Sequence, residues 1–343
     1  MRRAVALFLL VLVAGCGGSG GSATTSTGAS APQAQRSDFA GIYADDVFFG
    51  DASYRRQALA EQHDAGVQLI RQPFGWADWA REPQRFDDFV GAAASAGIRV
   101  LPVLVGPDPG AGADGGMKPP AQPARFAGWA AVLVQRYGPD GSFWKDHPGT
   151  PKLPIVSWQI WNEPNITAWW APKPDPAAYA DLLRQTAAAI HEVDPKAEIV
   201  AAGLPTSHLG TPAPEFLAEV MKAGAPFDIA AVHPYAATPD AVVKRVKEIQ
   251  RVAAGKKVWV TEVGWGTGGK PGPLTVTPER QAAYVKETIT RMHALGVRGV
   301  VIFQWRDPKP FAGRREIWPY YAGLHDADGR PKPSLAAFSE AVK

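Results

Sequence analysis

From residue 38 onward the chain alternates between short apolar runs and longer amphipathic segments. The apolar runs are hydrophobic at consecutive positions, which is typical of strands covered on both faces in a parallel sheet. They predict strands at Phe39–Ala44, Val67–Arg71, Ile98–Val105, Ile155–Ile160, Glu198–Ala202, Phe227–Val232, Lys257–Thr261 and Val297–Phe303. The segments between them predict helices at Tyr54–Ala65, Phe86–Ala96, Pro123–Tyr137, Pro176–Val193, Pro214–Ala223, Asp240–Ala253, Pro278–Leu295 and Ser334–Val342.

The junctions between these segments favour one arrangement of the strands. Glycine separates a predicted helix from the next strand at Gly66, Gly97 and Gly296, as in tight helix–strand loops. Strands and helices that alternate eight times predict a single (β/α)8 barrel, or TIM barrel, over residues 38–343. An open doubly wound sheet is the structural alternative. It is less favoured because no glycine-rich phosphate loop follows the first strand.

The first residues predict a targeting signal rather than a part of the fold. A basic start at Met1–Arg3 precedes the apolar run Ala4–Ala14, which is too short to cross a bilayer and suits a signal peptide at 1–15. The end of that run, Val13-Ala14-Gly15-Cys16, resembles a bacterial lipobox. The resemblance implies lipid attachment at Cys16, and a plain secretory signal is the alternative. Residues 17–37 are rich in Gly, Ser, Thr, Ala and Gln, so we expect a flexible tether over 16–37 and an extracytoplasmic, membrane-anchored lipoprotein.

Composition excludes several classes of function. The net charge is only +3 and the basic residues are scattered, so no nucleic-acid partner is expected. Cys16 is the single cysteine, so no intramolecular disulfide can form. The sequence has no His-Glu-x-x-His motif or acidic calcium loop, and we therefore expect no metal and no cofactor. It also lacks the Gly-x-Ser-x-Gly turn of serine hydrolases. We expect the chain to act as a monomer.

Two glutamates follow apolar runs at places where a barrel collects its active-site residues. Glu163 comes directly after the fourth predicted strand, and Glu262 ends the seventh. The carboxyl ends of both strands meet at one mouth of a barrel, so the two side chains can share a cleft. Cleavage of a glycosidic bond needs such a pair, one carboxyl to protonate the leaving oxygen and one to attack or stabilise the anomeric carbon. Solvated loop glutamates are the alternative interpretation.

The motifs around these glutamates resemble those of a known group of enzymes. Asn162-Glu163-Pro164 after strand four, with Thr261-Glu262 at strand seven, is similar to clan A of the retaining (β/α)8 glycoside hydrolases, which includes cellulase-like, xylanase-like, β-xylosidase-like and iduronidase-like families. The resemblance implies an acid/base role for Glu163, a nucleophile role for Glu262 and a contact from Asn162 to the sugar 2-hydroxyl. It also implies a poly- or oligosaccharide substrate.

Other positions match the clan more loosely. Arg71, at the end of the second predicted strand, resembles an arginine that hydrogen-bonds the nucleophile. His233 and Tyr235 resemble a His-x-Tyr pattern in which the tyrosine hydroxyl contacts the nucleophile. Trp305 resembles the aromatic floor beneath the bound sugar. A surface arginine and a structural histidine are the alternatives for the first two.

The loops after the strands add candidate sugar platforms and one departure from the clan. Trp76, Trp169 and Trp170 are candidates to bind substrate, with Asp78 and Trp79 beside them, and ordinary loop packing is the alternative. Cellulase-like families often carry a histidine after strand three, but here the sequence reads Leu101–Gly106 without one. A cellulase-like substrate is therefore less favoured. The general pattern is closer to the β-xylosidase and iduronidase-like families, or to a bacterial exopolysaccharide hydrolase related to them.

The same residues leave other functions open. A transglycosylase uses the same site with a sugar hydroxyl in place of water. A carbohydrate-binding barrel without turnover is a second alternative, which the presence of both glutamates and Asn162 argues against. A barrel enzyme of another chemistry is the third.

Overall fold

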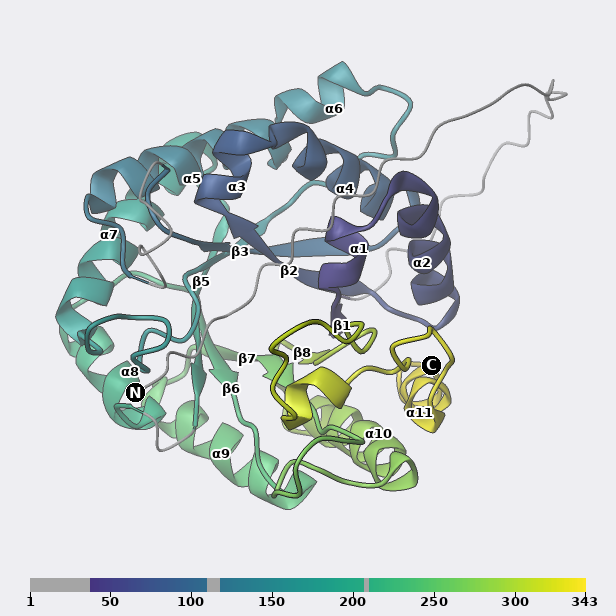
Figure 1. The fold of residues 1–343 in the computed structure, drawn as a ribbon. Coiled ribbons are helices and arrows are strands. Elements are labelled where there is room, and N and C mark those ends of the chain that lie inside the picture. The colour runs from purple at the N-terminus through teal and green to yellow at the C-terminus, as the bar shows by residue number, and fades with distance from the viewer. Residues whose placement is uncertain (1–37, 110–117, 207–209) are drawn as a thin grey trace, which may run out of the picture. The chain divides into compact units, whose positions relative to one another are not determined.

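Parallel strands close into a barrel in the computed structural model, which describes residues 38–109, 118–206 and 210–343. Each strand pairs with its sequence neighbours, and β8 closes the ring on β1 (Figure 1). The strands of the described residues are β1 (Ala40–Tyr43), β2 (Leu69–Gly75), β3 (Arg99–Val105), β4 (Ser157–Ile160), β5 (Glu198–Pro205), β6 (Ile229–His233), β7 (Lys257–Val263) and β8 (Gly299–Ile302). The predicted (β/α)8 barrel is confirmed. The predicted signal peptide, tether and lipid site at Cys16 lie outside the described residues.

Helices surround the barrel (Figure 1). They are α1 (Asp45–Phe49), α2 (Ala52–Asp64), α3 (Trp76–Arg81), α4 (Pro83–Ser95), α5 (Pro123–Tyr137), α6 (Ser142–Asp146), α7 (Pro176–Val193), α8 (Ala213–Lys222), α9 (Pro239–Val252), α10 (Pro278–Ala294), α11 (Pro333–Ala341) and the 3-10 helix η2 (Trp318–Tyr321). Proline begins many of them, and Asp175, Thr238 and Thr277 cap α7, α9 and α10 through their side-chain oxygens. No helix of the described residues combines the length and the apolar character needed to cross a bilayer.

Three strands run at least two residues further than the sequence predicted. β2 continues past Arg71 to Gly75, β5 continues to Pro205 and β7 continues to Val263. The polar residues of Arg71-Gln72-Pro73 break the apolar pattern, yet β2 stays in register with β3 over its whole length. Arg71 therefore lies inside β2 rather than at its end, because pairing with the neighbouring strand overrides local composition.

The barrel interior has an apolar layer beneath a polar one. The apolar layer consists of Leu69, Leu101, Val200, Ile229, Ala231, Trp259 and Val301. Two positions further along their strands come Arg71, His233 and Thr261, all fully buried or nearly so. Side chains on a strand alternate between its faces, so these polar groups point into the same interior, one layer nearer the carboxyl ends. The apolar layer thus seals the barrel below a polar mouth.

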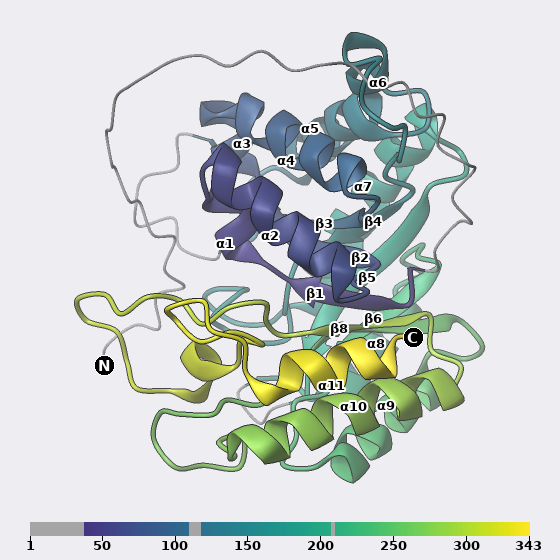
Figure 2. The same cartoon turned by 90° about the vertical axis from the view of Figure 1, so that its right-hand side faces the viewer.

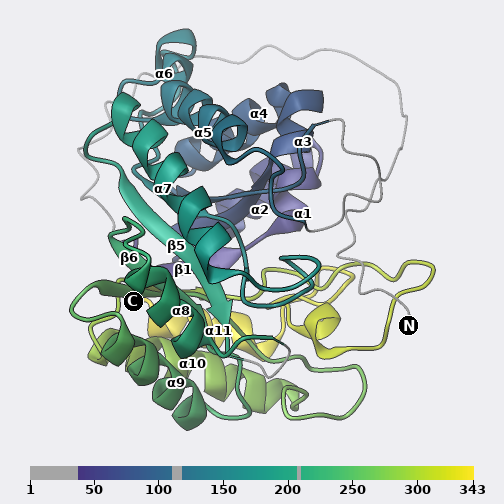
Figure 3. The ribbon, with the colours of Figure 1, turned by 90° about the vertical axis from the view of Figure 1, so that its left-hand side faces the viewer.

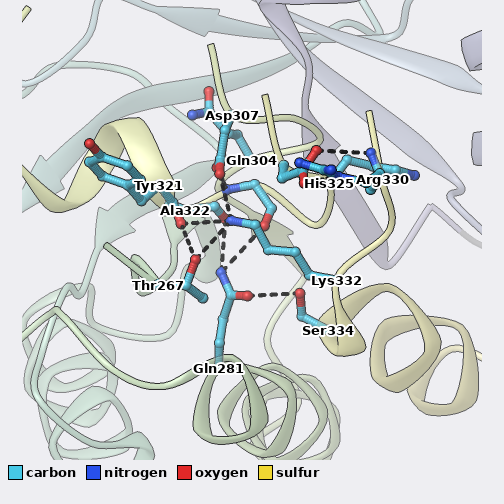
Figure 4. Close-up of polar contacts among 12 residues, drawn as sticks. Thr267, Gln281, Gln304, Asp307, Tyr321, Ala322, His325, Arg330, Lys332 and Ser334 are labelled. Atoms are coloured by element: carbon cyan, nitrogen blue, oxygen red, sulfur yellow. Dashed lines mark hydrogen bonds and ion pairs between the residues drawn. The ribbon is translucent and has the colours of Figure 1, made fainter. Parts of the chain in front are cut away.

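The long segment between β8 and α11, residues 303–332, is held in place by buried polar contacts. Lys332 forms a buried ion pair with Asp307 at 2.7 Å and donates to the Tyr321 carbonyl at 2.9 Å. From α10, Gln281 donates to backbone carbonyls of this segment and accepts from Ser334 (Figure 4). Figures 2 and 3 show the segment in yellow at the end of the barrel where α1 and α3 also lie. We call the Asp307–Lys332 pair and its partners the loop brace.

Candidate active site

Glu163 stands on a kinked backbone at the end of β4. Trp161 and Glu163 both have positive φ, 71° and 48°. These conformations are uncommon for residues other than glycine and persist only where surrounding contacts impose them. Here the Trp161 amide donates to Leu104 O at 2.9 Å, its buried indole donates to Trp169 O at 2.8 Å, and the Glu163 amide donates to Gly203 O at 3.1 Å. Bonds to β3 and β5 therefore fix the turn that presents Glu163.

Glu262, near the end of β7, is held through both carboxylate oxygens. Arg71 forms an ion pair with Oε1, and the Tyr235 hydroxyl donates to Oε2 at 2.6 Å. Bonds to a charged carboxylate from a guanidinium and a phenol are among the stronger hydrogen bonds in proteins. They fix both the charge and the orientation of Glu262.

Arg71 connects the two glutamate-bearing strands. Besides Glu262, its guanidinium donates to Gln159 Oε1 at 2.7 Å and to Asn162 Oδ1 at 2.8 Å. Gln159 in turn donates to Ala201 O at 3.1 Å. Arg71 is 1% exposed, and a charge buried that deeply is tolerated only when it is paired and hydrogen-bonded.

His233 lies between the two carboxyl groups. Its Nδ1 is 2.7 Å from Glu163 Oε1 and 3.6 Å from Glu262 Oε2, while its Nε2 is 3.1 Å from Thr261 Oγ1. The imidazole fits because β5 carries a glycine opposite it. A Cβ on Gly203 would lie 2.0 Å from His233 Nε2. Any larger residue at 203 would displace the ring.

The two carboxyl groups have pKa values shifted in opposite directions. Burial raises the pKa of Glu163, and the negative charge of Glu262 adds to this against the opposing contact with His233. Burial also raises the pKa of Glu262, but the charges of His233 and Arg71 and the Tyr235 hydrogen bond outweigh it and hold that pKa below its usual value. One carboxyl thus keeps a proton while the other stays ionised, the division of roles that acid/base chemistry on two carboxyls requires.

The same three groups are close enough to be tested as a metal site. One ligand atom from each of Glu163, His233 and Glu262 lies within 4.8 Å of the others. Two carboxylates and an imidazole are a plausible donor set for a divalent cation. Arg71 already pairs with Glu262, however, so its positive charge would repel a cation at this point. The arrangement fits a carboxyl pair better than a metal centre.

The aromatic residue that reaches this site from β8 is Phe303 rather than Trp305. Trp305 is 2% exposed, and its ring packs on His325 at 4.5 Å. Phe303 packs on Tyr43 at 5.1 Å and on Tyr235 at 6.4 Å, the tyrosine that holds Glu262. Phe303 follows Val301 of the apolar layer by two positions, and that spacing was the sequence signal for its inward direction.

A second aromatic residue comes from the segment fixed by the loop brace. Trp318, in η2, lies 5.0 Å from the ring of Tyr235 and 6.2 Å from that of Phe303. It is partly exposed, so one face can still meet a ligand. No pattern in the sequence singled it out, because its position depends on contacts between β8, α10 and the loop.

Two of the candidate platform tryptophans are packed inside the protein. Trp76 is 6% exposed and stacks on Trp129 at 5.9 Å. Trp170 is 3% exposed and packs against Trp161 at 5.7 Å. Trp169 is partly exposed, and its carbonyl accepts the Trp161 indole bond. Of these three, Trp169 alone is partly exposed, and it lies in the loop that follows Glu163.

Sequence reasoning missed a polar group on β1 and α1. The Tyr43 hydroxyl donates to Asp45 Oδ2 at 2.5 Å, and Gln72 Nε2 donates to Asp45 Oδ1 at 2.9 Å. The charge of Glu262 acts on both Tyr43 and Asp45, which places them beside the site. The available signal was position alone, since Asp45 directly follows the first strand where a barrel places functional residues.

Comparison with known proteins identifies the class of this site. Residues 158–297, which include both glutamates, match the family model of the glycosyl hydrolase catalytic core. This match covers less than half of the chain. The chain is an enzyme of the glycoside hydrolase class, as the resemblance of its motifs implied. No curated protein sequence matches the chain.

Solved structures of glycoside hydrolases share the fold at low sequence identity. A monomeric β-xylosidase from Caulobacter crescentus superposes with a TM-score of 0.66 at 21% identity, covering 91% of this chain and 69% of that one. A glucosidase from Croceicoccus marinus gives 0.67 at 15% identity over 90% and 66% of the two chains. A GH53 catalytic domain from Ignisphaera aggregans gives 0.62 at 19% identity over 91% and 98%. This barrel is therefore a scaffold on which several glycosidases are built.

Proposed function

We propose that this glycoside hydrolase cleaves O-glycosidic bonds of a poly- or oligosaccharide with retention of anomeric configuration. Glu163 acts as acid/base and Glu262 as nucleophile. The observation that carries the proposal is the carboxyl pair itself, with opposite pKa shifts and oxygens within 4.8 Å. Carboxyl groups about 5–5.5 Å apart suit retention, whereas inverting enzymes need about 6.5–9.5 Å to admit a water molecule.

In the first step Glu262 attacks the anomeric carbon while Glu163 gives its proton to the glycosidic oxygen. The bond between that carbon and oxygen breaks, the leaving group departs as an alcohol, and the sugar becomes an ester of Glu262. Arg71 and Tyr235 hold the attacking carboxylate ionised and oriented. Because Arg71 occupies the amide oxygen of Asn162, the amide nitrogen is left to donate to a sugar hydroxyl.

In the second step water attacks the anomeric carbon of the ester, the bond from that carbon to Glu262 breaks, and the sugar leaves with its new hydroxyl while Glu262 returns to a carboxylate. Glu163 is now a carboxylate and takes a proton from that water. Forming the ester removes the negative charge of Glu262, which had raised the pKa of Glu163. The pKa of Glu163 therefore falls, and the ionised carboxylate can act as the general base of this step. His233, at hydrogen-bond distance, keeps the carboxyl in place through both steps.

The aromatic side chains support a carbohydrate as the ligand. Trp318 and Phe303 line the side of Tyr235 next to the nucleophile, and Trp169 lies near the acid/base. Aromatic faces suit the C–H faces of sugar rings. The structural neighbours are named for different sugars, xylose and glucose among them, so the sugar must be found by experiment.

The decisive experiment replaces Glu262 and looks for chemical rescue. Turnover of a panel of 4-nitrophenyl glycosides and oligosaccharides is measured for the wild type and for Glu262→Ala. We expect a loss on the order of 10⁴- to 10⁶-fold, as when other enzymes lose their nucleophile. Azide then restores part of the activity and gives a glycosyl azide of inverted configuration, because it attacks from the side that Glu262 vacates.

A matched control lies at the opposite end of the same barrel. Glu198 begins β5, is partly exposed, and pairs with Lys257. Glu198→Gln removes a carboxylate without touching the mouth and keeps wild-type turnover. Unchanged activity in Glu262→Ala would overturn the assignment of the nucleophile.

We further propose that the enzyme is a lipoprotein on the outer side of a bacterial membrane, on the strength of the Val13–Cys16 motif. Cys16→Ser then releases the protein from the membrane fraction on cell fractionation. Continued membrane retention of that variant would contradict the anchor.

A further inference from the structure

Helix α1 begins with two adjacent aspartates that have different surroundings. Asp45 accepts hydrogen bonds from Tyr43 and Gln72, both neutral donors, and remains partly exposed. Asp46 accepts from the Tyr54 hydroxyl, and the charge of Arg306 acts on it. Arg306 also contacts the Tyr54 hydroxyl at 3.5 Å. Arg306 therefore contacts the partner of the second aspartate, whereas Arg71 acts on the first aspartate and on Tyr43 through its charge alone.

Asp45 is left with acceptor capacity that the described part of the chain does not use. An ionised carboxylate offers about four acceptor positions, and the two hydrogen bonds from Tyr43 and Gln72 take two of them. Within the described residues Asp45 forms no ion pair, although the charge of Arg71 opposes the repulsion from Glu262. A partly buried carboxylate with unused acceptor positions is costly, so a ligand that donates hydrogen bonds would be favoured there.

The position of Asp45 determines which part of a substrate it meets. Tyr43 ends β1, and its ring packs on Phe303 at 5.1 Å, next to the nucleophile. Glu163 protonates the leaving oxygen from β4, so the leaving group lies toward β4 and β5. In the closed strand order β1 stands opposite β5. Asp45 therefore borders the sugar whose anomeric carbon is attacked.

We propose that Asp45, oriented by Tyr43 and Gln72, is a specificity-determining residue that accepts hydrogen bonds from hydroxyl groups of the attacked sugar. Its free acceptor positions suit two neighbouring hydroxyls, as a carboxylate can accept one on each oxygen. Sugars without a hydroxyl at that point are poor substrates. This inference rests on the proposed function, since it needs a sugar bound with its anomeric carbon at Glu262.

The experiment combines a change in the enzyme with a change in the substrate. The best 4-nitrophenyl glycoside of the panel is compared with its monodeoxy derivatives, each lacking one hydroxyl, on the wild type, Asp45→Asn and Asp46→Asn. Asp45→Asn keeps the size of the side chain, and thermal unfolding of each variant checks that it folds. Asp46→Asn is the matched control, because Asp46 sits on the same helix and also holds a tyrosine, Tyr54, outside the site.

The expected result is a specific loss of hydroxyl dependence. For wild type, removing the hydroxyl that Asp45 binds lowers kcat/KM roughly 10- to 100-fold, the value of a hydrogen bond to a charged group. Asp45→Asn lowers kcat/KM on the parent glycoside by a similar factor. In this variant, removing the same hydroxyl from the substrate then lowers kcat/KM little further. Asp46→Asn retains the wild-type ratios throughout.

Two results would overturn the inference while leaving the proposed function intact. One is that Asp45→Asn keeps wild-type kcat/KM on every glycoside. The other is that it lowers kcat/KM by the same factor on the parent and on all deoxy derivatives, which would make Asp45 a residue that acts on the nucleophile alone. Failure of the proposed function is distinguishable, because it would appear as full activity in Glu262→Ala.

Discussion

The mouth of the barrel and the loop brace both bury opposite charges, but they use them differently. In the brace, Asp307 pairs with Lys332 at 2.7 Å and takes the Gly323 amide at 2.6 Å, while Lys332 also donates to Thr267. In the mouth, two carboxyl groups share contacts with Arg71 and His233, and Glu163 keeps an exposed edge. A closed pair of equal and opposite charges stabilises a loop. Two carboxyl groups beside one arginine, with Glu163 partly exposed, leave a proton on Glu163 that can be transferred to a substrate.

The pKa shifts express the same contrast. In the brace, burial raises the pKa of Asp307 and lowers that of Lys332, and each partner opposes the shift of the other. In the mouth, two glutamates have pKa values shifted in opposite directions, with the pKa of Glu163 raised and that of Glu262 lowered. Burial alone therefore does not make a catalytic carboxyl. The number and placement of neighbouring cations decide which carboxyl keeps its proton.

Of the three variants that compare the barrel mouth with the loop brace, Glu163→Gln is expected to have the largest effect on turnover. Loss of a general acid costs about 10²- to 10⁴-fold in turnover, most on oligosaccharides and least on glycosides whose leaving group departs without a proton. The raised pKa of Glu163 also predicts that wild-type activity falls as pH rises through that pKa. Glutamine does not titrate, so the variant loses this alkaline limb. Kinetics across leaving groups and pH measure both effects, and an equal loss on all leaving groups would contradict the role.

Breaking the brace should change stability rather than chemistry. Lys332→Met leaves Asp307 buried without its cation, which costs about 3–5 kcal/mol in the free energy of unfolding. Urea unfolding measures this, and the double variant with Asp307→Asn should recover part of the loss. Well below its unfolding temperature the single variant keeps kcat/KM within about tenfold, because no brace residue contacts either glutamate. Normal stability with a large loss of turnover would place the pair in the catalytic machinery instead.

The smallest expected effect, and the sharpest on the mouth alone, comes from Tyr235→Phe. The variant keeps the ring that packs on Trp318 and removes the hydrogen bond to Glu262. Because that bond helps to lower the pKa of Glu262, its loss raises the pKa. The wild-type enzyme loses activity as pH falls through the pKa of Glu262, so this acid limb moves to higher pH in the variant. Above the limb kcat/KM falls by roughly tenfold, and an unmoved acid limb would show that Tyr235 does not tune Glu262.

The sequence by itself determined the barrel and the position of the two glutamates. Consecutive apolar runs, proline-started helices and glycine junctions are local signals that repeat along the chain, so their sum was sufficient for the fold. In such a barrel the carboxyl ends of strands meet at one mouth, and this placed Glu163 and Glu262 together before any side chain was located.

Only the tertiary structure decided what surrounds the pair. Strand pairing carried β2 past Arg71, packing on His325 buried Trp305, and neighbouring aromatic side chains covered Trp76 and Trp170. Asp45 and Trp318 reach the site from segments far apart in sequence. These contacts join side chains from different strands and loops. A local sequence pattern cannot predict them, because their energies depend on long-range packing.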